Sequence, residues 1–102
     1  MYGIAFGAAR MRSELTFNSN DVIVNEHRYQ QLFKARSAMI AAYGSELTFE
    51  AKGGIKQRRI ADYLSGSIEN RDEWADYVAW SIDSQRRLRR AVDAAGGMPA
   101  SG

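Results

Sequence analysis

The longest regular pattern of apolar and polar positions in the chain runs from Asn70 to Ala95. It contains no glycine or proline, and Asn70 and Glu73 have the spacing of a capping box. Gly96 and Pro99 follow it as stop signals. We therefore expect one long C-terminal helix of about 38 Å. At about 100° per residue, one apolar stripe of this helix carries Trp74, Tyr77, Val78, Leu88 and Val92, with Ile82 beside it.

Trp80 does not belong to this stripe, because it projects about 120° away from it. One interpretation is that a second helix of the same domain covers it. The other is an interface with a partner or a second copy, since aromatic residues and arginine are enriched at interface cores. On that interpretation the candidate interface residues are Tyr77, Trp80 and Arg87.

The charges of the same helix are sorted by sign. Asp72, Glu73 and Asp76 lie in its first turns, which complements the helix macrodipole. Asp83 is placed to pair with an arginine four residues on. The last third carries more positive charge than the dipole requires, in the residues Arg86, Arg87, Arg89 and Arg90.

The N-terminal part of the chain predicts strands. Bulky residues at positions 2, 4 and 6 alternate with small ones, so the segment 1–10 is either an edge strand or a disordered leader before a start at Met11. Ser13–Phe17 has a strand pattern, turn formers follow, and Val22–Val24 is β-branched. This order predicts a β-hairpin with a four-residue loop.

The pentapeptide of Ser13–Phe17 recurs at Ser45–Phe49, and two copies are too few for a repeat architecture. We expect a second strand there, paired with the first in one sheet. Between them, Asn25 can cap a helix that runs to Tyr43 and closes at Gly44. Ile55–Leu64 reads as a further short helix.

Together these elements predict a small α+β domain. It has three helices, the C-terminal one longest, packed on an antiparallel sheet of two or three strands. With 102 residues the chain is one domain, for which we expect a compact part at 11–96 and a flexible tail at 97–102.

The composition excludes several kinds of chemistry. There is no cysteine, and therefore no disulfide, thiol nucleophile or cysteine metal site, which fits a reducing compartment. No segment reaches the ~18 apolar residues of a membrane span, and Met1–Ala9 lacks the features of a secretory signal. The sequence predicts a cytoplasmic location and no membrane contact.

No motif of an enzyme is present. The single histidine excludes a histidine pair, and there is neither a serine-centred elbow nor a glycine-rich nucleotide loop. The carboxylate pairs Asp72/Asp76 and Glu69/Glu73 lie at a helix N-terminus, where acidic residues are common anyway. We expect a non-enzymatic binding module without cofactor or metal.

Nucleic acid is the partner that the charges favour, because the pI is near 9.2 and eleven of the fourteen basic residues are arginine. The order of a short helix, a Ser-Gly-Ser turn and a longer helix is similar to a helix-turn-helix unit. However, the first turns of the longer helix contain three acidic residues, which would repel DNA. We expect phosphate contacts by a module that self-associates as a homo-oligomer. The candidate contact residues are Lys56, Arg58, Arg59, Arg86, Arg87, Arg89 and Arg90.

The alternative is a protein-binding module, such as a phage or mobile-element type inhibitor, adaptor or virion-assembly component. Trp80, the arginine cluster and a sticky segment at Tyr2, Ile4 and Phe6 would form its interface. The two functions differ in what the arginines do. Convergence on one open face favours a polyanion, and neutralisation by carboxylates favours a protein partner.

Overall fold

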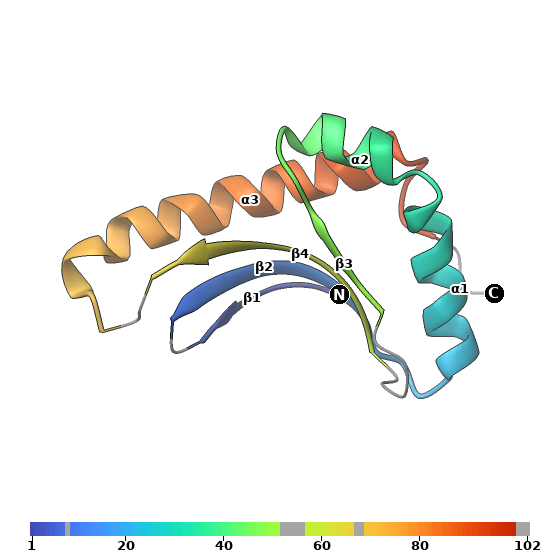
Figure 1. The fold of residues 1–102 in the computed structure, drawn as a ribbon, viewed down its shortest axis with the longest axis horizontal. Coiled ribbons are helices and arrows are strands. Elements are labelled where there is room, and N and C mark those ends of the chain that lie inside the picture. The colour runs from blue at the N-terminus through green and yellow to red at the C-terminus, as the bar shows by residue number, and fades with distance from the viewer. Residues whose placement is uncertain (8, 52–56, 67–68, 100–102) are drawn as a thin grey trace.

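A computed structural model describes residues 1–7, 9–51, 57–66 and 69–99. In this structure the helices lie on one side of an arched sheet (Figure 1). The elements follow in the order β1 (Tyr2–Phe6), β2 (Arg10–Phe17), α1 (Val22–Phe33), α2 (Arg36–Tyr43), β3 (Thr48–Glu50), β4 (Arg58–Ser65), a 3₁₀ turn η1 (Arg71–Glu73) and α3 (Trp74–Ala94).

The sheet is antiparallel throughout, with the strand order β1-β2-β4-β3. The predicted α+β class, with three helices and the longest at the C-terminus, is confirmed, but the sheet has four strands instead of two or three. β1 is one edge of the sheet, which is the first of the two forms expected for the segment 1–10.

Val22–Val24 was predicted as the second strand of a hairpin, and that prediction is wrong. These residues begin α1, because the side chain of Asp21 caps the helix. Its Oδ1 accepts hydrogen bonds from the backbone N–H groups of Ile23 at 2.9 Å and Val24 at 3.3 Å. A satisfied helix N-terminus outweighs the β propensity of three β-branched residues.

Asp21→Ala should lower the free energy of unfolding by about 1 kcal/mol, because two N–H groups of the first turn lose their acceptor. Urea unfolding followed by circular dichroism measures the change. The control is Asn18→Ala, an exposed position before the cap. Equal stability of the two variants would contradict the capping role.

The helix expected from Asn25 to Tyr43 is divided into α1 and α2 at Lys34–Ala35. Its predicted end is confirmed, since Gly44 has φ +95° and its N–H bonds to the carbonyl of Ile40 at 2.9 Å. Only glycine adopts this left-handed conformation without strain.

The helix predicted at Ile55–Leu64 is wrong for the residues that the structure describes, because 58–65 form β4, an interior strand of the sheet. The similarity to a helix-turn-helix unit fails with it. Polar residues hide the alternation of this strand. Arg58 and Asp62 lie on its helix-facing side, where Arg58 meets Glu26 at 2.5 Å and Asp62 accepts a hydrogen bond from Tyr43 at 2.6 Å.

The two copies of the repeated pentapeptide both contribute to the sheet, but they do not pair with each other. β4 lies between β2 and β3 and pairs with both. The expected direct pairing is therefore wrong, although both copies belong to one sheet as predicted.

The long C-terminal helix is confirmed as α3, but the capping box is not formed. The carboxylate of Glu73 instead accepts a hydrogen bond from the hydroxyl of Tyr77 at 2.7 Å, and the amide of Asn70 donates to the same hydroxyl at 3.4 Å. None of the described helices is long and apolar enough to cross a membrane.

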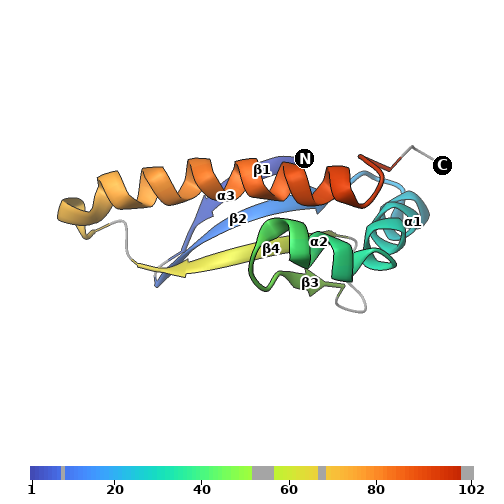
Figure 2. The ribbon, with the colours of Figure 1, turned by 90° about the horizontal axis from the view of Figure 1, so that it is seen from above.

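One hydrophobic core joins the helices to the sheet. Residues from β2, α1, α2, β4 and α3 bury nearly all of their surface in it, among them Leu15, Leu32, Met39, Tyr43, Ile60, Leu88 and Val92. α3 lies over β1 and β2, whereas α2 lies beside α3 toward β3 (Figure 2). Within the part of the chain that the structure describes, no helix lies on the opposite face of the sheet (Figure 1).

Candidate functional site

α3 buries part of the predicted apolar stripe. Tyr77, Leu88 and Val92 lie in the core as expected, whereas Trp74 and Val78 do not. The buried residues of α3 are Tyr77, Ser84, Leu88, Ala91 and Val92. Ser84 and Ala91 are small, so α2 and the sheet can approach the helix closely there. Two residues expected in the stripe remain exposed, Trp74 at 46% and Val78 at 59%, and so does Ile82 beside it at 56%.

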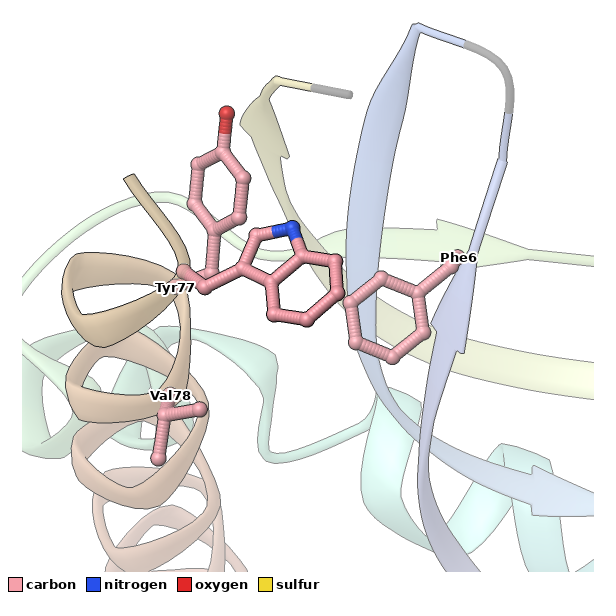
Figure 3. Close-up of a pocket in the computed structure, with 4 residues that line it drawn as sticks. Phe6, Tyr77 and Val78 are labelled. Carbon is pink, nitrogen blue, oxygen red and sulfur yellow. The ribbon is translucent and has the colours of Figure 1, made fainter. Parts of the chain in front are cut away.

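These three side chains follow one another at intervals of four residues and so form a continuous apolar row along α3. We call Trp74, Val78 and Ile82 the apolar row. At the N-terminal end of the helix the row continues into a cleft of about 220 Å³, which Phe6, Trp74, Tyr77 and Val78 line. Figure 3 shows Tyr77 and Val78 extending from α3 while Phe6 comes from β1 across the cleft. The cleft thus lies between the helix and the edge strand.

Contacts of both its hydroxyl and its ring hold the side chain of Tyr77 in place in the wall of the cleft. Its hydroxyl is held by Glu73 and Asn70, and its ring lies against Gly66, the residue after β4. A Cβ atom on Gly66 would lie 2.6 Å from the Tyr77 oxygen, so a larger residue there would displace the ring. The Gly66 N–H also bonds to the Ala9 carbonyl at 3.0 Å, which ties β4 to the end of the β1–β2 hairpin.

Further along, α3 is anchored to the strands below it. The amide of Gln85 donates to the Gly3 carbonyl at 3.0 Å and to the Ser13 hydroxyl at 2.9 Å. The Arg89 guanidinium lies 4.6 Å from the centre of the Tyr2 ring. The cleft therefore lies on the N-terminal side of a fixed attachment between α3 and β1.

The helix-free face of the sheet carries a line of alternating charges across three strands. The guanidinium group of Arg59 in β4 contacts two carboxylates. Its nitrogen atoms lie 3.6 Å from an oxygen of Glu50 in β3 and 3.0 Å from an oxygen of Glu14 in β2. Glu14 in turn lies 2.6 Å from Arg12. We call Glu50, Arg59, Glu14 and Arg12 the charge line. It orders this face of the sheet and ends beside β1.

Tyr63 contacts one end of the charge line. Its hydroxyl donates to Glu50 at 2.6 Å, and burial together with this hydrogen bond raises the pKa of Tyr63. The Arg10 guanidinium lies 3.9 Å from the centre of its ring. A small hollow of about 100 Å³ opens here between β1 and these side chains, lined by Ala5, Phe6, Gly7, Arg10, Arg12 and Tyr63.

A protein-family model with the description "Domain of unknown function (DUF4268)" matches residues 2–95. The chain belongs to the DUF4268 family. No curated protein and no solved structure matches it.

The arginines predicted to bind phosphate are distributed over several faces of this DUF4268 domain. Arg58 lies on the helix side of the sheet with Glu26, and Arg59 lies on the opposite face within the charge line. Arg87 lies 2.9 Å from Asp83, donates to the Tyr43 carbonyl at 3.0 Å and covers the Tyr43 ring. Carboxylates of the same chain thus neutralise three of the candidates.

The other arginines predicted to bind phosphate are not neutralised by a carboxylate among the described residues. Arg86, Arg89 and Arg90 are exposed on α3, and within the described residues no carboxylate lies within ion-pair distance of them. Lys56 falls outside the residues that the structure describes. Whether any of these seven residues binds phosphate stays a prediction.

The predicted protein interface is partly buried within the DUF4268 domain itself. Tyr77 is 5% exposed, and Trp80 and Arg87 are half-buried. Trp80 lies on the side of α3 that also carries Ser84 and Arg87, both of which contact Tyr43 of α2. Among the described residues, no group of three acidic or histidine side chains could hold a metal ion.

The sequence interpretation did not include Val78 and Ile82 in an interface, because it placed Val78 in the buried stripe and Ile82 beside that stripe. Their four-residue spacing continues from Trp74, which is the signal that could have separated this row from the buried residues. Phe6 was included only as part of a sticky segment. Arg10, Arg12 and Tyr63 show no pattern in the sequence, because only strand pairing brings them together.

Proposed function

We propose that this DUF4268 domain is a non-enzymatic, cytoplasmic protein-binding module whose interface is the apolar row and the adjoining cleft. The observation that carries the proposal is the continuity of three exposed apolar side chains with an apolar cleft. Contiguous exposed apolar surface of this kind marks interaction sites. Covering the exposed parts of Phe6, Trp74, Val78 and Ile82 would contribute on the order of 1 kcal/mol each.

The arrangement of the arginines also supports a protein partner. A polyanion site needs several positive side chains on one face, and three of the candidates are paired with carboxylates on different faces. The apolar row, by contrast, has neighbours of both signs along α3, with acidic residues near Trp74 and arginines beyond Ile82. An apolar centre with a charged surround is the usual anatomy of a protein interface.

Val78→Asp should abolish the capture of partner proteins, because it places a charge in the middle of the interface. The experiment compares proteins retained from cell extract by the wild-type chain, by Val78→Asp and by Ile23→Asp. Ile23 is 80% exposed on α1 and serves as the matched control. Both positions are exposed, so the melting temperature should change little.

A protein that the wild type and Ile23→Asp retain, and that Val78→Asp loses, supports the proposal. Equal retention by all three chains would contradict it.

Nucleic acid is the second candidate partner, on one specific observation. Arg86, Arg89 and Arg90 share one exposed side of α3. Fluorescence anisotropy of labelled DNA over a salt series tests it with the triple variant to glutamine. Micromolar binding that weakens steeply with salt, with a slope reduced by about three in the variant, would establish phosphate contacts there.

A further inference from the structure

β1 has an open hydrogen-bonding edge. The Met1 amino group donates to the Thr16 carbonyl at 2.6 Å, the Thr16 N–H donates to the Met1 carbonyl at 2.9 Å, and the Gly7 N–H donates to the Arg10 carbonyl at 2.8 Å. Because an antiparallel ladder alternates, the N–H and C=O groups of Gly3 and Ala5 also point to β2. Those of Tyr2, Ile4 and Phe6 therefore point away from the sheet, and no described residue pairs with them.

The two edges of the sheet differ in how they are protected. β3 at the other edge has only three residues and ends in the charged Glu50. β1 has five residues, Tyr-Gly-Ile-Ala-Phe, without a charge, a proline or an interruption of its register. Natural sheets protect edges with short strands, charges, prolines or bulges, because an edge without them accepts another strand.

On its inner side β1 faces the cleft. Tyr2, Ile4 and Phe6 face the helices, since their partners in β2 are Leu15, Ser13 and Met11, which are buried there. α3 lies above this edge of the sheet (Figure 2). A strand added beside β1 would therefore place every second side chain next to Phe6 and the apolar row. Those side chains need to be apolar, because the cleft is lined by apolar groups.

On its outer side β1 faces the end of the charge line. Gly3 and Ala5 lie opposite Glu14 and Arg12, so β1 contributes no large side chain to this face. A Cβ atom on Gly3 would meet no atom within 4 Å. The charge line alternates acid, base, acid, base across the sheet and ends on Arg12, with Arg10 beside the same hollow. The next strand would continue the alternation with an acidic side chain.

We propose that the partner of the cleft is an extended segment of another protein, which adds to β1 as a fifth strand of the sheet. Its inward side chains are apolar and contact Phe6 and the apolar row, and its outward side chains are Asp or Glu and pair with Arg10 and Arg12. This inference rests on the proposed function and names the partner's chemistry. It uses both hollows beside β1, one for each set of alternating side chains.

A second copy of the chain fits this edge less well. If β1 paired with β1 of another molecule, the inward residues would match, but Gly3 and Ala5 would again be the outward residues. Arg10 and Arg12 would then gain no carboxylate from the added strand. The charge on this face therefore favours a different protein segment over self-association.

The test begins with a displayed library of random decapeptides selected against the immobilised full chain. We expect enriched peptides to alternate apolar residues with Asp or Glu. Selection against Arg12→Glu should replace the acidic residues by Lys or Arg at the same spacing. Arg10→Glu serves as a second bait, because Arg10 lies outside the charge line and its replacement leaves Glu14 and its partners in place.

Hydrogen exchange of single amides then distinguishes strand addition from a simple apolar contact. With one enriched peptide bound, exchange at Tyr2, Ile4 and Phe6 should slow at least about tenfold, because their N–H groups enter a ladder. Gly3 and Ala5 are the internal control, since they already point to β2. Val78→Asp should weaken the same peptide by about tenfold or more, and Arg12→Gln by about five- to tenfold at low salt.

The outcomes separate the two proposals. One outcome is that Val78→Asp abolishes peptide binding, but the bound peptide does not slow amide exchange at Tyr2, Ile4 and Phe6 of the wild type. This result overturns strand addition and leaves the protein-binding cleft in place. Enriched peptides without alternation or acidic residues overturn the chemistry proposed for the partner, and so does a library that yields no enrichment. A dimer in sedimentation experiments that Val78→Asp dissociates would identify a second copy as the occupant and overturn the inference.

Discussion

Leu88→Ala is expected to lower the free energy of unfolding by about 2–5 kcal/mol, whereas Val78→Ala should change it by less than about 0.5 kcal/mol. Leu88 is 1% exposed in the core between α3 and the sheet, so its truncation leaves a cavity. Val78 is 59% exposed, so its truncation removes little buried surface. The apolar stripe of the sequence predicts similar losses for both, because it places both on one face of the helix.

Urea unfolding of the two variants measures this difference directly. Similar destabilisation by both would mean that α3 is rotated about its axis relative to this structure, and the apolar row would then be part of the core. A large effect for Leu88 alone supports the orientation on which the proposed interface depends. Ile82→Ala is a second exposed control from the same row.

Tyr43→Phe is the change with the second largest expected effect, a loss of about 1–3 kcal/mol. The hydroxyl of Tyr43 donates to Asp62 at 2.6 Å, so the hydroxyl of Ser84, also at 2.6 Å, must donate to it. Tyr43 and Ser84 are buried. Removal of one hydroxyl therefore leaves one oxygen of Asp62 and the hydroxyl of Ser84 without their Tyr43 partner at the junction of α2, β4 and α3.

The same cluster predicts how stability depends on alkaline pH. Burial, and next the hydrogen bond to Asp62, raises the pKa of Tyr43 above its ordinary value of about 10. Below about pH 10 the tyrosine is neutral in both states and its contribution is fully present. Above that pH the unfolded chain ionises while the folded chain does not, so the free energy of unfolding falls as pH rises.

Unfolding free energies measured between pH 8 and 11 check this expectation. Above about pH 10, the free energy of unfolding should fall less steeply in Tyr43→Phe than in the wild type. The reason is that the wild type has one more tyrosine whose ionisation is suppressed in the folded state. Tyr2, Tyr29 and Tyr63 also have raised pKa values and keep part of the dependence in both proteins. Parallel curves would contradict the cause assigned to Tyr43.

The parts of the fold that the sequence predicted are those decided by local signals. The glycine after Tyr43 ends α2 as expected, and the absence of glycine and proline from 74 to 94 produces one long helix. The strand of Ser13–Phe17 follows from its alternating pattern. Each of these features depends on residues close together in the chain.

The errors arose where distant partners decide the structure. β4 was not predicted as a strand because its inward positions include the charged residues Arg58 and Asp62. Their distant partners Glu26 and Tyr43 help to satisfy them inside the domain. The orientation of α3 could not be read from its own residues, since α2 covers its Ser84 side and leaves Val78 exposed. The candidate site was missed for the same reason. Its two walls lie about 70 residues apart in the chain.

The position of the two identical pentapeptides on either side of β4 has a consequence for how the chain folds. Leu15, the third residue of the first pentapeptide, pairs with Ile60, and so does Phe49, the fifth residue of the second. The two registers therefore differ by two residues, which is an even number. Either copy could therefore occupy either side of β4 with its apolar face toward the helices. β2 extends the ladder over eight residues and β3 over three, so length selects the native arrangement. A nascent β4 has two alternative partners, and we expect the exchange between them to add a slow phase to refolding.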